Sequence, residues 1–139
     1  MTQEERNLLT QDLCARLPYN VKVKHLLDTY PSDLLCIDAE KNVVYVNHYG
    51  SEGKYKIECI RPYLRPLSSM TEKENLSLAE FVGVRVSARH GEIYFPNLSD
   101  NTACNWHKAF DWLNKNMFDY RGLIPRGLAN AALEGMYNS

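Results

Sequence analysis

The sequence predicts an α+β fold: an N-terminal helix, then a small antiparallel β-sheet or SH3-like half-open barrel, with C-terminal helices packed on the sheet. Two observations lead to this class. Helical apolar patterns occur near both ends of the chain, and short runs of alternating apolar residues, separated by turn residues, lie between them. The chain has 139 residues, of which 45% are apolar and 24% charged, so we expect one globular domain over residues 1–139.

The first helix is predicted from its start and stop signals. Thr2 and Glu5 have the spacing of a capping box, in which the threonine oxygen accepts a backbone N–H and the glutamate reaches back to the cap. Leucines then recur every four residues as far as Leu17, which gives the helix one apolar face. Pro18 disfavours helical geometry at Leu17, so we expect the helix to end there.

Four segments after this helix have strand character. Val21–His25 alternates apolar and polar residues, and Leu34–Ile37 with Val43–Val46 reads as a hairpin across a polar turn. Apolar and charged residues alternate again over Tyr55–Cys59, which predicts a fourth strand. Arg61–Pro66 contains two prolines that cannot donate a ladder hydrogen bond, so we expect an extended exit segment there and not a central strand.

The next elements are a short helix and a second hairpin. Thr71 with Glu74 forms a second capping box, which predicts a helix to about Phe81. Beyond it, the alternation within Val84–Phe95 fits a hairpin better than a continued helix.

The strongest amphipathic pattern lies near the C-terminus. Trp106, Phe110 and Leu113 recur with helical spacing, so this helix is expected to pack on the sheet. Leu123–Leu133 is expected to add one or two further helical turns, followed by a loose C-terminal end.

Charge and hydropathy limit the classes of partner. Sixteen basic and seventeen acidic residues give a net charge of −1, so no global field attracts the chain to nucleic acid or anionic lipid. The longest apolar runs are far shorter than the ~20 residues that a membrane-spanning helix needs. Acidic residues stand near the N-terminus, where a signal peptide would be basic. We therefore expect a cytoplasmic protein without membrane association.

The four cysteines do not form a motif. Cys14, Cys36, Cys59 and Cys104 are spaced for neither a dense disulfide framework nor a zinc cluster, so we expect small buried core residues. Cys104 and His107 share a helical face but supply only two of the four ligands that structural zinc takes. No metal or other cofactor is predicted.

No catalytic signature stands out. The sequence contains no nucleophile elbow, no phosphate-binding glycine loop and no His-Glu-x-x-His motif. We therefore expect a protein that is not an enzyme, with a small metal-dependent or thiol enzyme as the second alternative.

Basic and aromatic residues gather in two stretches and supply the candidate contact set. Its members are Arg61, Tyr63, Arg65, Tyr120 and Arg121. Such residues can stack on bases and contact phosphate, which makes a nucleic-acid-binding accessory protein the first alternative. Their long stems can equally cover apolar surface within the fold.

The tyrosine content favours a protein partner. Nine tyrosines are many for this length, and tyrosine buries large area at modest entropic cost in interfaces. Tyr30, Tyr49, Tyr63 and Tyr94 stand in turns or beside prolines and are the expected exposed ones. A non-enzymatic protein-binding module is therefore the leading interpretation, and self-association is a further option.

Several stretches together resemble one family. They are Leu17–Tyr19, Arg61–Thr71, Trp112–Asn114, Phe118–Ile124 and Gly127–Ala129. These runs are similar to a family of small proteins carried by phages, prophages and mobile elements of gut anaerobes. The resemblance covers about a quarter of the chain.

The resemblance implies a phage-linked accessory protein with a protein partner in the host cell, and it implies no reaction. Relatives often carry a histidine pair before the Phe118–Gly122 run, whereas this chain has Asn116–Met117. Histidine-based chemistry is therefore not expected at that position.

Overall fold

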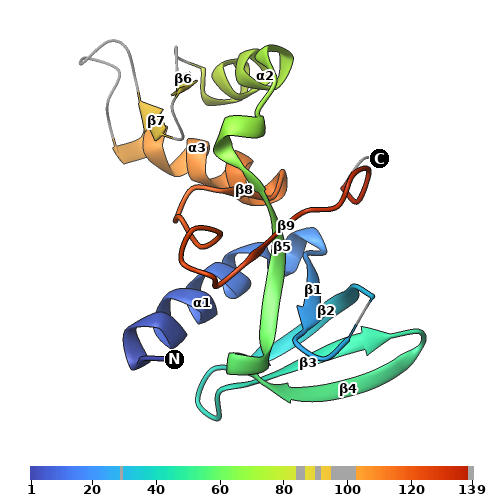
Figure 1. Ribbon diagram of the computed structural model, residues 1–139. Coiled ribbons are helices and arrows are strands. Elements are labelled where there is room, and N and C mark those ends of the chain that lie inside the picture. Colours follow the sequence, from blue (N-terminus) through green and yellow to red (C-terminus); the bar gives the residue numbers. More distant parts are fainter. Residues whose placement is uncertain (29, 84–86, 90–91, 95–102, 138–139) are drawn as a thin grey trace. The chain divides into compact units, whose positions relative to one another are not determined.

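The computed structural model describes residues 1–28, 30–83, 87–89, 92–94 and 103–137 (Figure 1). The chain divides into two compact units. Unit 1 comprises Met1–Leu64 and Arg121–Ser139, and unit 2 comprises Arg65–Tyr120. The expectation of one domain over residues 1–139 stays a prediction.

Unit 1 begins with helix α1 (Gln3–Arg16), as predicted. Thr2 is its N-cap: the threonine Oγ1 accepts the Glu5 N–H at 3.1 Å, and the Thr2 N–H donates to the glutamate Oε1 at 3.0 Å. A 3₁₀ turn that contains Pro18 follows the helix, and Asn20 then takes a left-handed conformation with φ of 61°. Both ends of α1 therefore lie where local sequence chemistry places them.

The sheet of unit 1 has the strand order β4-β3-β2-β1-β5, with antiparallel neighbours throughout (Figure 1). Its strands are β1 (Lys22–His25), β2 (Ser32–Asp38), β3 (Val43–His48), β4 (Ser51–Lys56) and β5 (Ile60–Pro66). A short strand β9 (Asn130–Ala131) pairs with β5 in parallel. The predicted α+β class is confirmed, and the sheet is open and mixed instead of purely antiparallel.

Alternation along the strands gives this sheet one buried face. Val23, Leu34, Val44 and Val46 are at most 5% exposed, and Leu34 pairs with Val46 in register. The register shifts after Leu34, and Leu35 at this irregularity is 46% exposed. The inner face supplies the core of the sheet, as the period-two pattern predicts.

The predicted fourth strand is shifted along the chain. β4 occupies Ser51–Lys56, whereas Ile57–Cys59 forms a 3₁₀ turn. The hairpin closes through Tyr49 and Gly50, whose φ angles are 51° and 83°. A two-residue turn with both φ positive matches the twist of the flanking strands, so pairing resumes at Ser51. The strand predicted over Tyr55–Cys59 therefore begins four residues too late.

The expectation that Arg61–Pro66 is only an exit segment is wrong. β5 runs through it and pairs with β1 over Ile60–Pro62, and with β9 at Tyr63 and Leu64. These two ladders occupy successive parts of β5. Most β5 residues therefore hydrogen-bond a strand on one side only, which is why a proline is tolerated.

The C-terminal segment is not helical. Hydrogen-bonded turns replace the helical turns expected over Leu123–Leu133, and Leu128 N–H donates to Leu123 O at 2.9 Å. Pro125 lacks an N–H, and Gly127 has φ of 73°, which an α-helix does not accept. The apolar residues of this segment form a small cluster with the end of β5.

The chain end is also held in place. The Tyr137 hydroxyl accepts the Lys22 N–H at 3.0 Å and donates to the Tyr63 carbonyl at 2.7 Å. A loose end was expected from the sequence. The structure instead attaches it to β1 and β5.

The described residues of unit 2 form two helices, a hairpin and a short strand. They are α2 (Glu72–Val82), β6 (Ser87–Arg89), β7 (Glu92–Tyr94), α3 (Ala103–Lys115) and β8 (Phe118–Asp119). β8 pairs in parallel with Arg65 and Pro66 at the end of β5. Thr71 caps α2 through the predicted capping box, with both bonds at 3.1 Å. β6 and β7 pair antiparallel, as expected, and the rest of the predicted hairpin lies outside the described residues.

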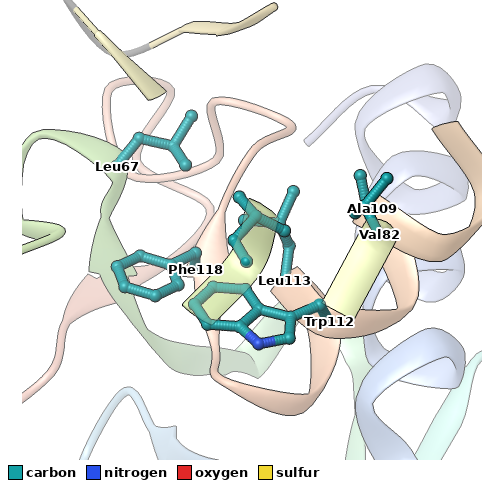
Figure 2. Packing of buried hydrophobic residues seen from close by; sticks show 7 residues of the cluster. Leu67, Val82, Ala109, Trp112, Leu113 and Phe118 are labelled. Atoms are coloured by element: carbon teal, nitrogen blue, oxygen red, sulfur yellow. The ribbon is translucent and has the colours of Figure 1, made fainter. Parts of the chain in front are cut away.

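The core of unit 2 forms where α2, α3 and β8 meet (Figure 2). Trp112 and Phe118 stack with their ring planes 8° apart and their centroids 5.8 Å apart. The other members of this cluster are Leu67, Leu78, Val82, Ala109 and Leu113. The predicted amphipathic helix is therefore confirmed, and its apolar face packs on α2 and β8.

The expectation of buried thiols is wrong for two cysteines. Cys14 and Cys36 are exposed, and Cys59 is half-buried, whereas the Cys104 side chain lies outside the described residues. Cys14 falls on the outer face of α1, next to buried Leu13. Cys36 lies after the register shift, which turns it outward. Within the described ranges, no helix has both the length and the apolar character that crossing a bilayer requires.

Candidate interaction surface

The predicted contact set is divided between the two units, so we locate each member in turn. Arg61, in β5, directs its guanidinium back onto the chain. Its Nη1 donates to the carbonyls of Glu58 and Ile60 at 2.8 and 2.9 Å, and its Nε donates to Gly127 O at 3.0 Å. The side chain thereby fastens the turn before β5 to the C-terminal segment.

Tyr63 is buried, with 5% of its surface exposed. The expectation that its position beside a proline exposes it is wrong, because β5 turns this ring inward. Burial raises the pKa of the Tyr63 phenol.

Arg65 makes a forked contact within unit 2. Its Nη1 and Nη2 donate to the two carboxylate oxygens of Glu74 at 2.6 and 2.7 Å. Its guanidinium carbon also lies 4.1 Å from the centre of the Phe118 ring. The Arg65 hydrogen bonds lower the pKa of the Glu74 carboxyl. Arg65 thus connects the start of α2 to β8.

Tyr120 and Arg121 also make internal contacts. The Tyr120 hydroxyl donates to Asn114 Oδ1 at 3.0 Å, and its ring stacks on Phe110 at 4.8 Å. Arg121 Nη1 donates to Asp12 Oδ1 at 2.7 Å. The second oxygen of the fully buried Asp12 carboxylate accepts from Arg16 Nε at 3.0 Å.

The five residues therefore stabilise their own units. Arg61 and Arg121 make hydrogen bonds within unit 1. Arg65 and Tyr120 pack at the edge of the hydrophobic core of unit 2. As a partner-binding set, the five residues stay a prediction.

A different group of side chains forms the most exposed apolar surface of unit 1. Leu27 is 88% exposed, Tyr49 75%, Tyr30 58% and Leu26 53%. We call these four residues the exposed loop cluster. Three of them come from the β1–β2 loop and Tyr49 comes from the β3–β4 turn, so two loops at one end of the sheet contribute.

Ring contacts join the two loops of this cluster. The Tyr30 and Tyr49 rings meet edge to face with centroids 5.9 Å apart. His48 lies 4.5 Å from the Tyr49 ring, and its Nδ1 is 2.8 Å from Ser32 Oγ, within hydrogen-bond distance. The tyrosines are thereby held by each other and by the start of β2.

The β1–β2 loop is held by its own backbone. Leu26 N–H donates to Cys59 O at 2.9 Å, and Asp28 N–H donates to His25 O at 3.0 Å. Leu27 N–H donates to His25 Nδ1 at 3.2 Å, while the His25 ring contacts the Tyr55 ring with centroids 4.3 Å apart and planes tilted by 35°. This arrangement leaves the Leu26 and Leu27 side chains to solvent, although the backbone that carries them is ordered by hydrogen bonds.

Sequence reasoning found half of this cluster. The turn positions of Tyr30 and Tyr49 predicted that they would be exposed, and this is confirmed. The Tyr94 side chain lies outside the described residues. Leu26 and Leu27 were not predicted, although the pattern pointed to them. The two leucines follow directly after the alternating strand ends, so the buried face of the sheet does not extend to them.

Among the described residues, side chains that could ligate a metal ion do not cluster. Over the described ranges, His, Cys, Asp and Glu do not gather in groups of three that could bind a metal ion. His107 is 82% exposed at its side chain and lies 3.9 Å from Asp111, one helical turn away. The Cys104 side chain falls outside the described part, so the structure does not place it relative to His107.

Comparison of the chain with protein-family models, curated proteins and solved structures gives no match.

Proposed function

We propose that this chain is a non-enzymatic protein-binding module, phage-linked as its sequence resemblance implies, that contacts its partner through the exposed loop cluster. The observation that carries the proposal is the exposure of two leucines and two tyrosines on adjoining loops. Large apolar side chains cost free energy in water, and groups of them on a surface mark interaction sites.

The make-up of the cluster suits a protein partner. Tyrosine is enriched in the cores of protein interfaces, and its two side-chain torsions make it cheap to immobilise. Ring contact between Tyr30 and Tyr49 orders both side chains before binding. The nearby charges have both signs, since Lys22 forms an ion pair with Asp33. A polyanion would find no one-signed field here.

The contacts of the arginines weigh against nucleic acid as the partner. Arg65 is paired with Glu74, and Arg121 is paired with Asp12. A guanidinium whose charge is already matched by a carboxylate attracts a phosphate less strongly.

The proposal is tested by capture from host lysate with a cluster variant. Leu27→Ser and Tyr49→Asn together remove the two most exposed members. Asparagine suits the left-handed φ of 51° at position 49, so the turn should persist. We expect the double variant to lose a nuclease-resistant partner that the natural chain retains.

The matched control is Leu76→Ser on α2, where a leucine is 64% exposed but lies outside the cluster. This variant should retain the partner. Equal loss in both variants, or full retention by the double variant, overturns the proposal. Recovery that disappears on nuclease treatment would replace a protein partner by nucleic acid.

A further inference from the structure

Among the described strands of unit 1, β4 pairs with β3 on one side and with no strand on its outer edge. β4 is the last strand in the order β4-β3-β2-β1-β5, and it pairs with β3 along its whole length (Figure 1). At the other end of this sheet, β5 is paired with β9. Among the strands described in unit 1, β4 therefore offers the open edge, and an open edge is a template for another strand.

The hairpin geometry fixes which main-chain groups of β4 point outward. His48 and Ser51 flank a two-residue turn, so they form a hydrogen-bonded pair, and such pairs then recur at every second residue. The Ile57 N–H donates to Asn42 O at 2.9 Å, which agrees with this alternation. The N–H and C=O groups of Glu52, Lys54 and Lys56 consequently point away from β3.

These outward-pointing residues carry charges of both signs: Glu52 is acidic, and Lys54 and Lys56 are basic. Glu52, Lys54 and Lys56 are all exposed. They share the outer face of the sheet, where the Lys54 ammonium lies 6.0 Å from the centre of the Tyr45 ring. A second strand laid on this edge would meet this charge pattern, so its own charges decide the register.

We propose that a second copy of this chain pairs with β4, edge to edge and antiparallel, with Gly53 on the two-fold axis. In this register, Glu52 of each copy faces Lys54 of the other. Both are outward-pointing residues, so each pair exchanges two main-chain hydrogen bonds as well as opposite charges. The contact is isologous, so it closes with two copies.

Other registers bring like charges together. If the two-fold axis passes through Lys54, the Lys54 side chains of the two copies face each other. If it passes through Glu52, the two Glu52 side chains face each other. An axis at Tyr55 places Lys54 opposite Lys56. The axis at Gly53 is the register in which Glu52 and Lys54 both meet opposite charges.

Gly53 also suits the axis sterically. It would form a non-hydrogen-bonded pair with its copy, the kind in which Cα atoms approach most closely. The ring of Tyr55 covers Gly53, because a Cβ atom at position 53 would lie 2.8 Å from Tyr55 Cε2. A glycine therefore meets a glycine at the closest point.

This pairing rests on the backbone and charges of β4 and does not depend on the exposed loop cluster. The contact is small, so we expect a weak dimer, with a dissociation constant of roughly 10 µM to 1 mM. Sedimentation equilibrium over a concentration series of the full chain measures it.

Charge reversal makes the test specific. Glu52→Lys alone and Lys54→Glu alone each place like charges in both cross-strand pairs, and each should weaken dimerisation by roughly tenfold or more. The double reversal Glu52→Lys/Lys54→Glu restores opposite charges and should restore the dimer. An equimolar mixture of the two single variants should also associate, because every pair is then complementary.

The control is Lys41→Glu, an exposed charge reversal outside β4, which should leave the dimer unchanged. A chain that stays monomeric up to about 1 mM overturns the proposal, as does a dimer that tolerates either single reversal. Failure of the double reversal to restore association would show that charge does not set the register, and it would overturn the proposal equally.

Discussion

Asp12 is fully buried on α1 between two arginines, one from its own helix and one from the C-terminal segment. A carboxylate in such a place is tolerated because both of its oxygens accept charge-assisted hydrogen bonds. Removing the Asp12 carboxylate leaves less negative charge to balance the guanidinium of the fully buried Arg16.

We therefore expect Asp12→Ala to lower the free energy of unfolding by about 3–5 kcal/mol. Urea denaturation followed by circular dichroism measures this change. Arg121→Ala is the comparison: its side chain is 16% exposed, so its loss should cost less. Equal stability of natural and Asp12→Ala chains would contradict a structural role for the cluster.

The forked contact between Arg65 and Glu74 gives a second prediction at this scale. Arg65→Lys keeps the charge but not the fork, and we expect it to lower unfolding stability by about 1–2 kcal/mol. Arg65→Ala also removes the stacking on Phe118 and should cost more. A melting temperature that either variant leaves unchanged would leave Arg65 available as the partner contact that the sequence predicts.

The same pair predicts acid sensitivity. Arg65 lowers the folded pKa of Glu74 below the ordinary value of 4.5. The stabilisation from this pair is therefore fully present above about pH 4.5 and is lost as the pH falls through the lower, folded pKa. Glu74→Gln should flatten that part of the stability profile, as measured by thermal melts in a pH series. If Glu74→Gln loses stability at acidic pH just as the natural chain does, Glu74 is not the cause of that loss.

At the scale of elements, the β3–β4 hairpin depends on a small residue under a large ring. A Cβ atom at position 53 would lie 2.8 Å from the Tyr55 ring, which also contacts the His25 ring. We expect Gly53→Ala to destabilise the chain by about 1–3 kcal/mol. Gly53→Ala in a Tyr55→Leu background should cost less, because leucine leaves the space open. Calorimetry of the four variants in this cycle measures the coupling.

The elements also show where sequence reasoning succeeds. Both capping boxes, the Pro18 stop and the stripe through Trp106 are local signals, and the structure confirms each of them. Local chemistry decides these features because the groups that satisfy them lie within one turn of the chain.

Features that depend on distant partners were not foreseen. β5 is a strand in spite of its prolines because β1 and β9 pair with different parts of it, and β9 lies far along the chain. Tyr63 and Arg65 look like surface residues from composition alone. Tyr63 is buried because β5 turns its ring inward, and Arg65 pairs with Glu74, which no local pattern indicates.

At the scale of the whole molecule, Tyr137 attaches the C-terminal segment to the sheet of unit 1. Burial raises the pKa of its phenol strongly. The folded state thus favours the neutral form, so this stabilisation is present at neutral pH and is lost as the pH rises above the ordinary value of 10.0.

We expect Tyr137→Phe to lower unfolding stability by about 1–3 kcal/mol, because the Lys22 N–H and the Tyr63 carbonyl lose their partner. The variant should also lose part of the alkaline destabilisation that the natural chain shows. Urea melts at pH values on both sides of 10.0 measure both effects. If both chains lose stability equally as the pH rises, a group other than Tyr137 causes the alkaline destabilisation.

The division of unit 1 into two sequence segments affects how the protein can be made. Residues 65–120 separate the two parts of unit 1 in the sequence. Strands β1 to β4 and most of β5 lie before them, and β9, Arg121 and Tyr137 lie after them. On the ribosome, Asp12 has Arg16 and β5 has β1 early, but each lacks its second partner until Arg121–Tyr137 has been synthesised. Unit 2 is continuous, so its whole core is available earlier. Synthesis from N- to C-terminus thus favours completion of unit 2 before unit 1, and a chaperone would meet an incomplete sheet with its acid–arginine cluster half formed.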